Sequence, residues 1–195
     1  NLGIQTNFES FIGGSAGDTF TGPTAANTWN LSAASTGTVT NASNTLSFAS
    51  FETLGGGNSS DNFIFGAGSS IGGLNGGQGL DMLNLSNLGV VRSVTLTSTT
   101  VEGFTGTDAA VTSGFTGINS IVATSLTPDS LTSVIAAPTT WNLGSTNSLV
   151  VNGQTLNFSL FDNFTGGNSG NTFNINGAVT GNLVGGSGDD IFNFN

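Results

Sequence analysis

A glycine-rich nonapeptide constrains this chain more than any other feature. Residues 185–193 read Gly-Gly-Ser-Gly-Asp-Asp-Ile-Phe-Asn, and residues 76–84 match the same template, G-G-x-G-x-D-x-(apolar)-x. Three weaker copies begin at Gly13, Gly56 and Gly166. We expect each copy to form a turn followed by a short strand, because paired glycines reach positive φ without a Cβ penalty. The apolar residue two places after the Asp or Asn should then point inward.

The chain also repeats itself at a longer spacing of about 110 residues. Trp29 recurs as Trp141 and Phe63 as Phe173. Other landmarks keep nearly the same offset: Phe48 and Phe158, Phe51 and Phe161, Asp18 and Asp129, Gly76 and Gly185. Periodicity of this kind is typical of solenoids and repeat arrays.

These two periods predict an all-β fold, a right-handed parallel β-helix (β-solenoid) with about 20 residues per coil and about nine or ten coils. We expect residues 1–195 to form a single continuous solenoid, in which 8–119 are the first unit of the ~110-residue repeat and 120–195 a partial second unit. Like residues of successive coils stack inside a solenoid. The phenylalanines and both tryptophans should therefore form a core ladder.

Two stretches lack the nonapeptide. Residues 32–45 are rich in Ser, Thr, Ala and Asn, and we expect them to form an exposed coil or a loop outside the solenoid. In residues 86–123, Val94 and Leu96 alternate with polar residues, as in a half-buried strand. The glycines of this second stretch are expected to form turns; they are Gly103, Gly106, Gly114 and Gly117.

The composition excludes several chemistries. The chain has no His and no Cys, one base (Arg92) and a net charge of −10. It therefore offers no imidazole base, thiolate or disulfide. One arginine cannot neutralise a phosphate backbone, so we expect no nucleic-acid partner. No apolar run is long enough for a membrane span.

The nonapeptides resemble the RTX, or haemolysin-type, calcium-binding repeats, which stack into a parallel β-helix. A wider pattern resembles repeat modules of very large secreted bacterial surface proteins, and the motifs that carry it are Trp29-Asn30-Leu31, Phe51-Glu52-Thr53-Leu54-Gly55-Gly56 and the glycine turns. The resemblance covers nearly the whole chain. It implies a structural repeat segment of an extracellular bacterial fibre, stalk or adhesin, at the cell surface or in a biofilm matrix.

The two ends of the sequence predict end-to-end assembly, with other copies of the chain or with flanking repeats. Phe8-Glu9-Ser10-Phe11 and Ile191-Phe192-Asn193-Phe194 both read as repeat motifs, and neither is covered by a charged or proline-rich cap. Open terminal coils present unpaired backbone groups that another coil can satisfy. We therefore expect the coils to continue into a filament.

Calcium is the cofactor that the RTX resemblance implies. In such repeats, turn carbonyls and Asp carboxylates hold the cation, and oxygen ligands suit a hard cation. The tentative metal ligands are Asp61, Asp81, Asn171, Asp189 and Asp190. An alternative interpretation stays open, in which these side chains cap backbone N–H groups as Asx turns do.

Two other function classes remain as alternatives. A carbohydrate- or surface-binding module would bind surface glycans through an exposed row of aromatic side chains, or through Trp29 and Trp141 at coil corners. A β-helix polysaccharide enzyme would need a pair of carboxylates. Most of the carboxylates lie in repeat-equivalent turns, whereas an active site is unique, and Arg92 is the only base. We therefore expect no enzyme and no catalytic residue.

Overall fold

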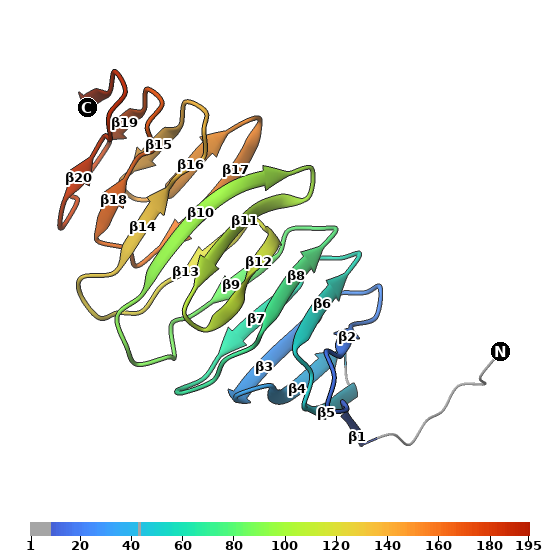
Figure 1. Ribbon diagram of the computed structural model, residues 1–195. Helices are drawn as coiled ribbons and strands as arrows, with labels where there is room; N and C mark the ends of the chain where they lie inside the picture. The colour runs from blue at the N-terminus through green and yellow to red at the C-terminus, as the bar shows by residue number, and fades with distance from the viewer. Residues whose placement is uncertain (1–8, 43) are drawn as a thin grey trace.

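The computed structural model describes residues 9–42 and 44–195. The regular secondary structure of these residues consists of β-strands, which form two sheets (Figure 1). Phe8, where the predicted first unit begins, lies outside the described residues. The larger sheet has 12 strands in the order β1 (Ser10–Ile12), β5 (Asn44–Ala49), β4 (Thr36–Asn41), β3 (Asn27–Ala33), β7 (Asn62–Phe65), β9 (Met82–Asn84), β13 (Ser120–Val122), β17 (Gln154–Ser159), β16 (Asn147–Val151), β15 (Thr140–Leu143), β19 (Thr172–Ile175) and β21 (Ile191–Phe194). The smaller sheet has nine, in the order β2 (Thr19–Thr21), β6 (Thr53–Gly57), β8 (Gly73–Gly77), β12 (Val111–Ile118), β11 (Gly103–Asp108), β10 (Ser93–Thr100), β14 (Ser130–Ser133), β18 (Asn163–Thr165) and β20 (Leu183–Val184).

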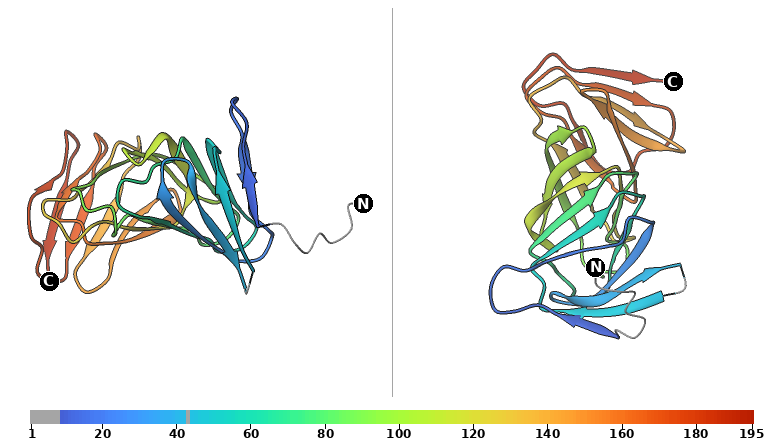
Figure 2. Two further views of the ribbon diagram at one scale, coloured as in Figure 1. Left: turned by 90° about the horizontal axis from the view of Figure 1, so that it is seen from below. Right: turned by 90° about the vertical axis from the view of Figure 1, so that its right-hand side faces the viewer.

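The molecule is elongated, with β1 and β2 near one end and β19, β20 and β21 near the other (Figures 1 and 2). The chain passes back and forth between the two sheets, and short connections, some of which contain glycine, join a strand of one sheet to a strand of the other. Most neighbouring strands are parallel, as in β6–β8 and β7–β9. The all-β, parallel-rich part of the prediction is thus confirmed.

Three antiparallel meanders interrupt the parallel order. They are β3–β4–β5 and β15–β16–β17 in the larger sheet and β10–β11–β12 in the smaller one. A spacing of about 20 residues between paired positions is therefore found only outside the meanders. Leu54 pairs with Leu74, 20 positions later, whereas Phe20 pairs with Leu54, 34 positions later, because the first meander lies between them.

The prediction of an exposed coil over residues 32–45 is wrong. This stretch contains β4 and the start of β5, and Val39 is buried opposite Leu46 in the first meander. The alternation Thr38-Val39-Thr40 is the period-two signal of a half-buried strand, and the Ser/Thr/Asn-rich surroundings obscured it.

The four glycines expected as turns lie within strands instead. Gly103 and Gly106 belong to β11, and Gly114 and Gly117 belong to β12. Gly114 and Gly117 have φ values of +88° and +68°, and the β11–β12 register shifts twice, which is typical of β-bulges. Glycine here allows a strand to bend without leaving the sheet.

Most of the aromatic side chains lie in the core, where several of them stack as predicted. Trp29 stacks on Phe63 at 5.8 Å between ring centroids, and Trp141 stacks on Phe173 at 5.6 Å. All four side chains are fully buried, and they belong to a single hydrophobic cluster that runs through the described residues. The stack continues from Phe173 to Phe192, with 4.8 Å between the centroids.

Nine consecutive strands recur with the same partners. β1 to β9 correspond to β13 to β21, as Phe11 to Ile121, Trp29 to Trp141 and Leu83 to Phe192 show, with offsets of 110, 112 and 109 residues. Pairs within the first set reappear in the second: β1–β5 as β13–β17, β3–β7 as β15–β19, and β6–β8 as β18–β20. The ~110-residue period is therefore a repeat of topology as well as of sequence.

We predict that Phe63→Ala and Phe173→Ala each lower the free energy of unfolding by roughly 3–5 kcal/mol, because each removes a buried ring from a continuous stack. The two losses should be similar, since the positions are repeat equivalents. Urea unfolding measures both, with Val101→Ala as a control at a side chain that is 87% exposed. A loss below about 1 kcal/mol at either phenylalanine would contradict this role in the core.

Candidate functional site

The glycine turns are joined by a ladder of side-chain oxygens. The backbone N–H of Asn27 donates to Asp61 Oδ1 at 2.7 Å, that of Asp61 to Asp81 Oδ1 at 2.8 Å, and that of Asp81 to Asn119 Oδ1 at 3.0 Å. In the second repeat, the N–H of Asn171 donates to Asp190 Oδ1 at 2.8 Å. We call these six residues the turn ladder. Each bond satisfies a turn N–H that the sheet hydrogen bonds do not reach.

The turn ladder agrees with the alternative interpretation that these residues cap backbone N–H groups, except that the capped group belongs to the neighbouring turn. Sequence reasoning missed Asn27 and Asn119 as members. Both stand two residues before a buried apolar side chain, Trp29 and Ile121, which is the spacing of Asp61 before Phe63. That spacing, rather than the glycine pair, is the signal that identifies the ladder.

The first glycine of each pair makes room for the ladder side chain. A Cβ on Gly56 would lie 2.4 Å from Asp61 Oδ2, and a Cβ on Gly76 would lie 2.6 Å from Asp81 Oδ2. Each such Cβ would also lie 2.2 Å from the carbonyl oxygen of the next turn. The second glycine has the predicted positive φ in three copies, at Gly57, Gly77 and Gly186, but not at Gly14 or Gly167.

The asparagines of the turn ladder place an amide nitrogen among carbonyl oxygens. Asn27 Nδ2 donates to the carbonyl oxygens of Pro23 and Gly56, at 3.0 and 3.1 Å, and to Asp61 Oδ1 at 2.7 Å. Asn171 Nδ2 likewise donates to three carbonyl oxygens and to Asp190 Oδ1. A hydrogen-bond donor is therefore the natural occupant of this position beside the next turn.

Asp61 and Asp81 place a carboxylate oxygen at the same position. Both side chains are buried, at 2% and 0% exposure, and neither Oδ2 has a hydrogen-bond partner in the described residues. Burial raises the pKa of Asp81 to about 7; the charges of Asp61 and Glu102 add to the rise, and the bond from the Asp61 N–H opposes it. Burial also raises the pKa of Asp61, against the hydrogen bonds from Asn27. A proton or a cation at Oδ2 would remove this cost.

The predicted calcium ligands fall into two groups with different surroundings. Asp61 and Asp81 occupy neighbouring turns and each keep one oxygen free to bind a cation. Asn171 uses both ends of its carboxamide, because its Oδ1 accepts the Thr139 hydroxyl at 2.5 Å and its Nδ2 donates as described above. Asp189 is exposed, and Asp190 accepts from Asn171. The first group fits a cation better than the second, although no point in the described residues gathers three or more carboxylates.

A second set of carboxylates caps turns at the opposite ends of the strands, where the chain passes from the larger sheet to the smaller one. The Arg92 N–H donates to Asp129 Oδ1 at 2.5 Å, and the Asp129 N–H donates to Asp162 Oδ2 at 2.8 Å. The Arg92 guanidinium is itself buried, and it donates through Nε and Nη2 to the buried Asp108. Arg92 is thus a structural residue that anchors β10 to β11, a role that the sequence did not indicate.

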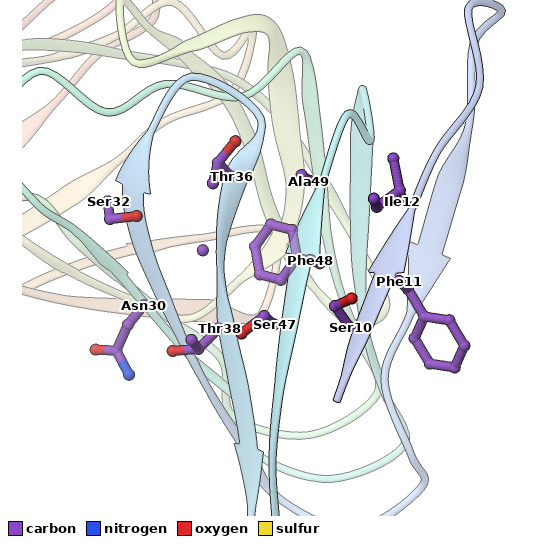
Figure 3. Close-up of a pocket in the computed structure, with 11 residues that line it drawn as sticks. Ser10, Phe11, Ile12, Asn30, Ser32, Thr36, Thr38, Ser47, Phe48 and Ala49 are labelled. Carbon is purple, nitrogen blue, oxygen red and sulfur yellow. The ribbon is translucent and has the colours of Figure 1, made fainter. Parts of the chain in front are cut away.

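The described surface has shallow hollows, and two of them are lined by the residues that follow. The larger, of about 420 Å³, lies over β1, β3, β4 and β5, and Figure 3 shows its lining of hydroxyl, amide and apolar side chains around the Phe48 ring. Its polar lining residues are Ser10, Asn30, Ser32, Thr36, Thr38 and Ser47. The smaller, of about 350 Å³, lies beside Glu102 and Asn75. Neither hollow is lined by Arg92 or by a pair of carboxylates.

Comparison with known proteins returned no match among family models, curated proteins or solved structures. Among the described residues, no helix has the length and apolar character that a membrane crossing requires.

We predict that Gly76→Ala destabilises the protein by about 2 kcal/mol or more, because the new Cβ overlaps the Gly117 carbonyl oxygen and Asp81 Oδ2. The matched control is Gly17→Ala, since a Cβ at Gly17 meets no atom within 4 Å. That control should change stability by no more than about 0.5 kcal/mol. Equal effects of the two substitutions in urea unfolding would contradict the assigned role of Gly76.

We predict that Asp81 makes the protein less stable as the pH rises from about 4 to about 7. In this window the unfolded side chain ionises near its ordinary pKa of 3.8, whereas the folded one keeps its proton until about 7. Stability is therefore fully retained below the lower value, and each pH unit in between costs up to about 1.4 kcal/mol. In EDTA, Asp81→Asn should make this slope shallower, leaving the contribution of Asp61, whose pKa burial also raises. The variant should also raise the melting temperature at pH 7, because its amide can donate as Asn27 and Asn171 do.

The matched control for this pH series is Asp162→Asn. Both Asp162 oxygens already accept hydrogen bonds, from the Asp129 N–H and the Thr180 hydroxyl. This variant should keep the wild-type slope between pH 4 and pH 7. A slope as steep in Asp81→Asn as in the wild type would show that Asp81 does not carry the pH dependence.

Calcium binding stays a prediction, and it has a separate test. A cation held only by the folded state stabilises it by mass action. If the turns bind calcium, EDTA should lower the melting temperature by several degrees. Asp61→Asn with Asp81→Asn should remove most of this dependence, because these two side chains hold the carboxylate oxygens that have no hydrogen-bond partner in the described residues. A melting curve that is unchanged over a range of calcium concentrations would refute calcium binding at these turns.

Proposed function

We propose that this chain is a structural repeat segment of an extracellular bacterial fibre, stalk or adhesin, and that its two sheets form the walls of a right-handed β-solenoid that continues end to end. The observation that carries the proposal is the recurrence of β1–β9 as β13–β21 with the same partners. A repeated topology adds length without adding a new site, which suits a spacer or fibre.

The direction of the strands supports continuation at the edges. Each meander reverses the chain twice, so β1 and β21 run in the same direction at the two edges of the larger sheet. The same holds for β2 and β20 in the smaller sheet. A further strand can therefore add in parallel at either end, which is the geometry that a continuing solenoid requires.

The side chains on the surface support a structural role over the alternatives. A glycan-binding module was expected to show a row of exposed aromatic rings, but Trp29 and Trp141 are buried. The exposed aromatic side chains of the described residues are Phe11, Phe192 and Phe194, and they lie on the two edge strands β1 and β21. For the enzyme alternative, Arg92 would have to face a substrate, and its guanidinium instead binds Asp108 in the interior.

The resemblance to RTX-like modules of bacterial surface proteins supports the extracellular assignment. The absence of cysteine suits an extended array that needs no disulfide framework, because each coil is held by its neighbours. A net charge of −10 keeps such a surface soluble and disfavours anionic partners.

The proposal predicts a defined gain in length per repeat. β1–β12 contribute six strands to each sheet, so one unit should advance the axis by about 29 Å at ~4.8 Å per strand. We expect a chain with residues 10–119 inserted once more before Ser120 to lengthen by this amount, with an unchanged cross-section. Small-angle X-ray scattering measures both quantities. An increase in cross-section, or two separate bodies, would contradict a continuous solenoid.

A further inference from the structure

The two sheets gain strands unequally along the molecule. The first set, β1–β12, contributes six strands to each sheet. The second set, β13–β21, contributes six strands to the larger sheet and three to the smaller one, namely β14, β18 and β20. Within the described residues, the second set therefore has no counterpart of the meander β10–β11–β12.

In the first set, that meander covers β8 and joins the two repeats. β12 pairs in parallel with β8, with Phe115 opposite Leu74 and Thr116 opposite Asn75. At its other side β10 pairs in parallel with β14, with Val94 opposite Leu131. The meander thus fills the smaller sheet between one repeat and the next.

The equivalent surface of the second set is open. β20 corresponds to β8 and is the outermost described strand of the smaller sheet. Leu74 is 3% exposed, whereas its counterpart Leu183 is only half-buried. The same contrast holds in the larger sheet, where Leu83 is fully buried and its counterpart Phe192 is 40% exposed.

We propose that the edge formed by β20 and β21 is a docking surface for a three-stranded antiparallel meander of the β10–β12 type. The inference rests on the proposed function, since it assumes that the sheets continue beyond their edges. The third strand of the meander pairs in parallel with β20, with the counterparts of Phe115 and Thr116 opposite Leu183 and Val184. The following strand, a counterpart of β13, pairs with β21 and covers Phe192, as β13 covers Leu83.

A second copy of the chain does not fit this edge as well. Its β1 corresponds to β13 and can pair with β21. Its β2 corresponds to β14, and in the smaller sheet the three strands β12, β11 and β10 separate β14 from β8, the counterpart of β20. A copy whose β1 pairs with β21 would therefore leave a gap of three strands between its β2 and β20. Three strands span about 14 Å, too large a step for the sheet hydrogen bonds to bridge. The meander is therefore the occupant that closes both sheets.

The occupant is defined by chemistry that β10–β12 display. Its inward side chains are apolar, as Leu96, Phe104 and Phe115 are. Its outward side chains are hydroxyl-rich: Thr105 and Thr116 share a hydrogen bond of 3.0 Å across β11 and β12. An ion pair like that of Arg92 with Asp108 neutralises both charges within the docking segment. No unpaired charge then has to be buried where the segment meets β20 and β21.

The test extends the intact chain with its own sequence. Because Asn193 corresponds to Asn84 at an offset of 109, a second copy of residues 87–122 added after Asn195 continues the repeat in register. We expect amide hydrogen exchange at Leu183–Val184 and Phe192–Phe194 to slow by about tenfold or more, because edge amides become paired. The Ile191 N–H already donates to the Asn171 carbonyl oxygen and should change less. The melting temperature should rise as well. The matched control carries the same extension with Phe115→Asp in the added copy, which should restore fast exchange at β20.

Two results would overturn the proposal. One is unchanged exchange at Leu183–Val184 in the extended chain, whether or not the added segment folds elsewhere. The other is slow exchange at these amides in the unextended chain at high concentration only, which would identify a second copy as the occupant. Neither result depends on the scattering experiment with the inserted unit, so failure of this docking surface and failure of the proposed function are distinguishable.

Discussion

The hydrogen bond from each turn N–H to a side-chain oxygen of the next turn is the interaction on which the rest of this structure depends. Hydrogen bonds between strands hold each sheet together, but the turns that connect the two sheets lie outside these strand pairs. Asp61, Asp81 and Asn119 satisfy the turn groups one after another, and each bond sets the spacing of two coils. The paired glycines follow from this requirement, because a Cβ at Gly56 or Gly76 would occupy the space of the ladder side chain.

A second constraint is that the two sheets gain the same number of strands in each full repeat. Each meander adds two strands beyond the one that a simple coil would place in its sheet. A meander in the larger sheet, β3–β5, is balanced in the same repeat by one in the smaller sheet, β10–β12. The balance explains why the unit is about 110 residues long rather than 20, and it is the basis of the docking surface proposed at β20. A structure that grows in balanced units is suited to length, which is the function proposed for it.

Much of this architecture could be predicted from the sequence, and the misses have physical reasons. The period-two alternation around Phe63 and Phe173 and the offset of Trp29 and Trp141 identified the core ladder and the long repeat. The meanders were missed because β4 consists of Thr, Gly, Val and Asn, so its composition indicates a coil while its alternation indicates a strand. At the turns, residue type alone does not distinguish a cation ligand from a hydrogen-bond acceptor. The neighbouring turn decides: Asn171 Nδ2 donates to the Gly185 carbonyl oxygen, whereas Asp81 Oδ2 has no hydrogen-bond partner in the described residues.

The most direct measurement of the central claim is hydrogen exchange at the backbone N–H of Asp61 in an Asp81→Ala variant. This substitution removes the one acceptor that the Asp61 N–H has, at 2.8 Å, and leaves the adjacent sheet bond from Met82 N–H to the Asp61 carbonyl oxygen in place. The account predicts much faster exchange at Asp61 with little change at Met82. Unchanged exchange at Asp61, or equal acceleration at both amides, would contradict a turn held by the oxygen of its neighbour.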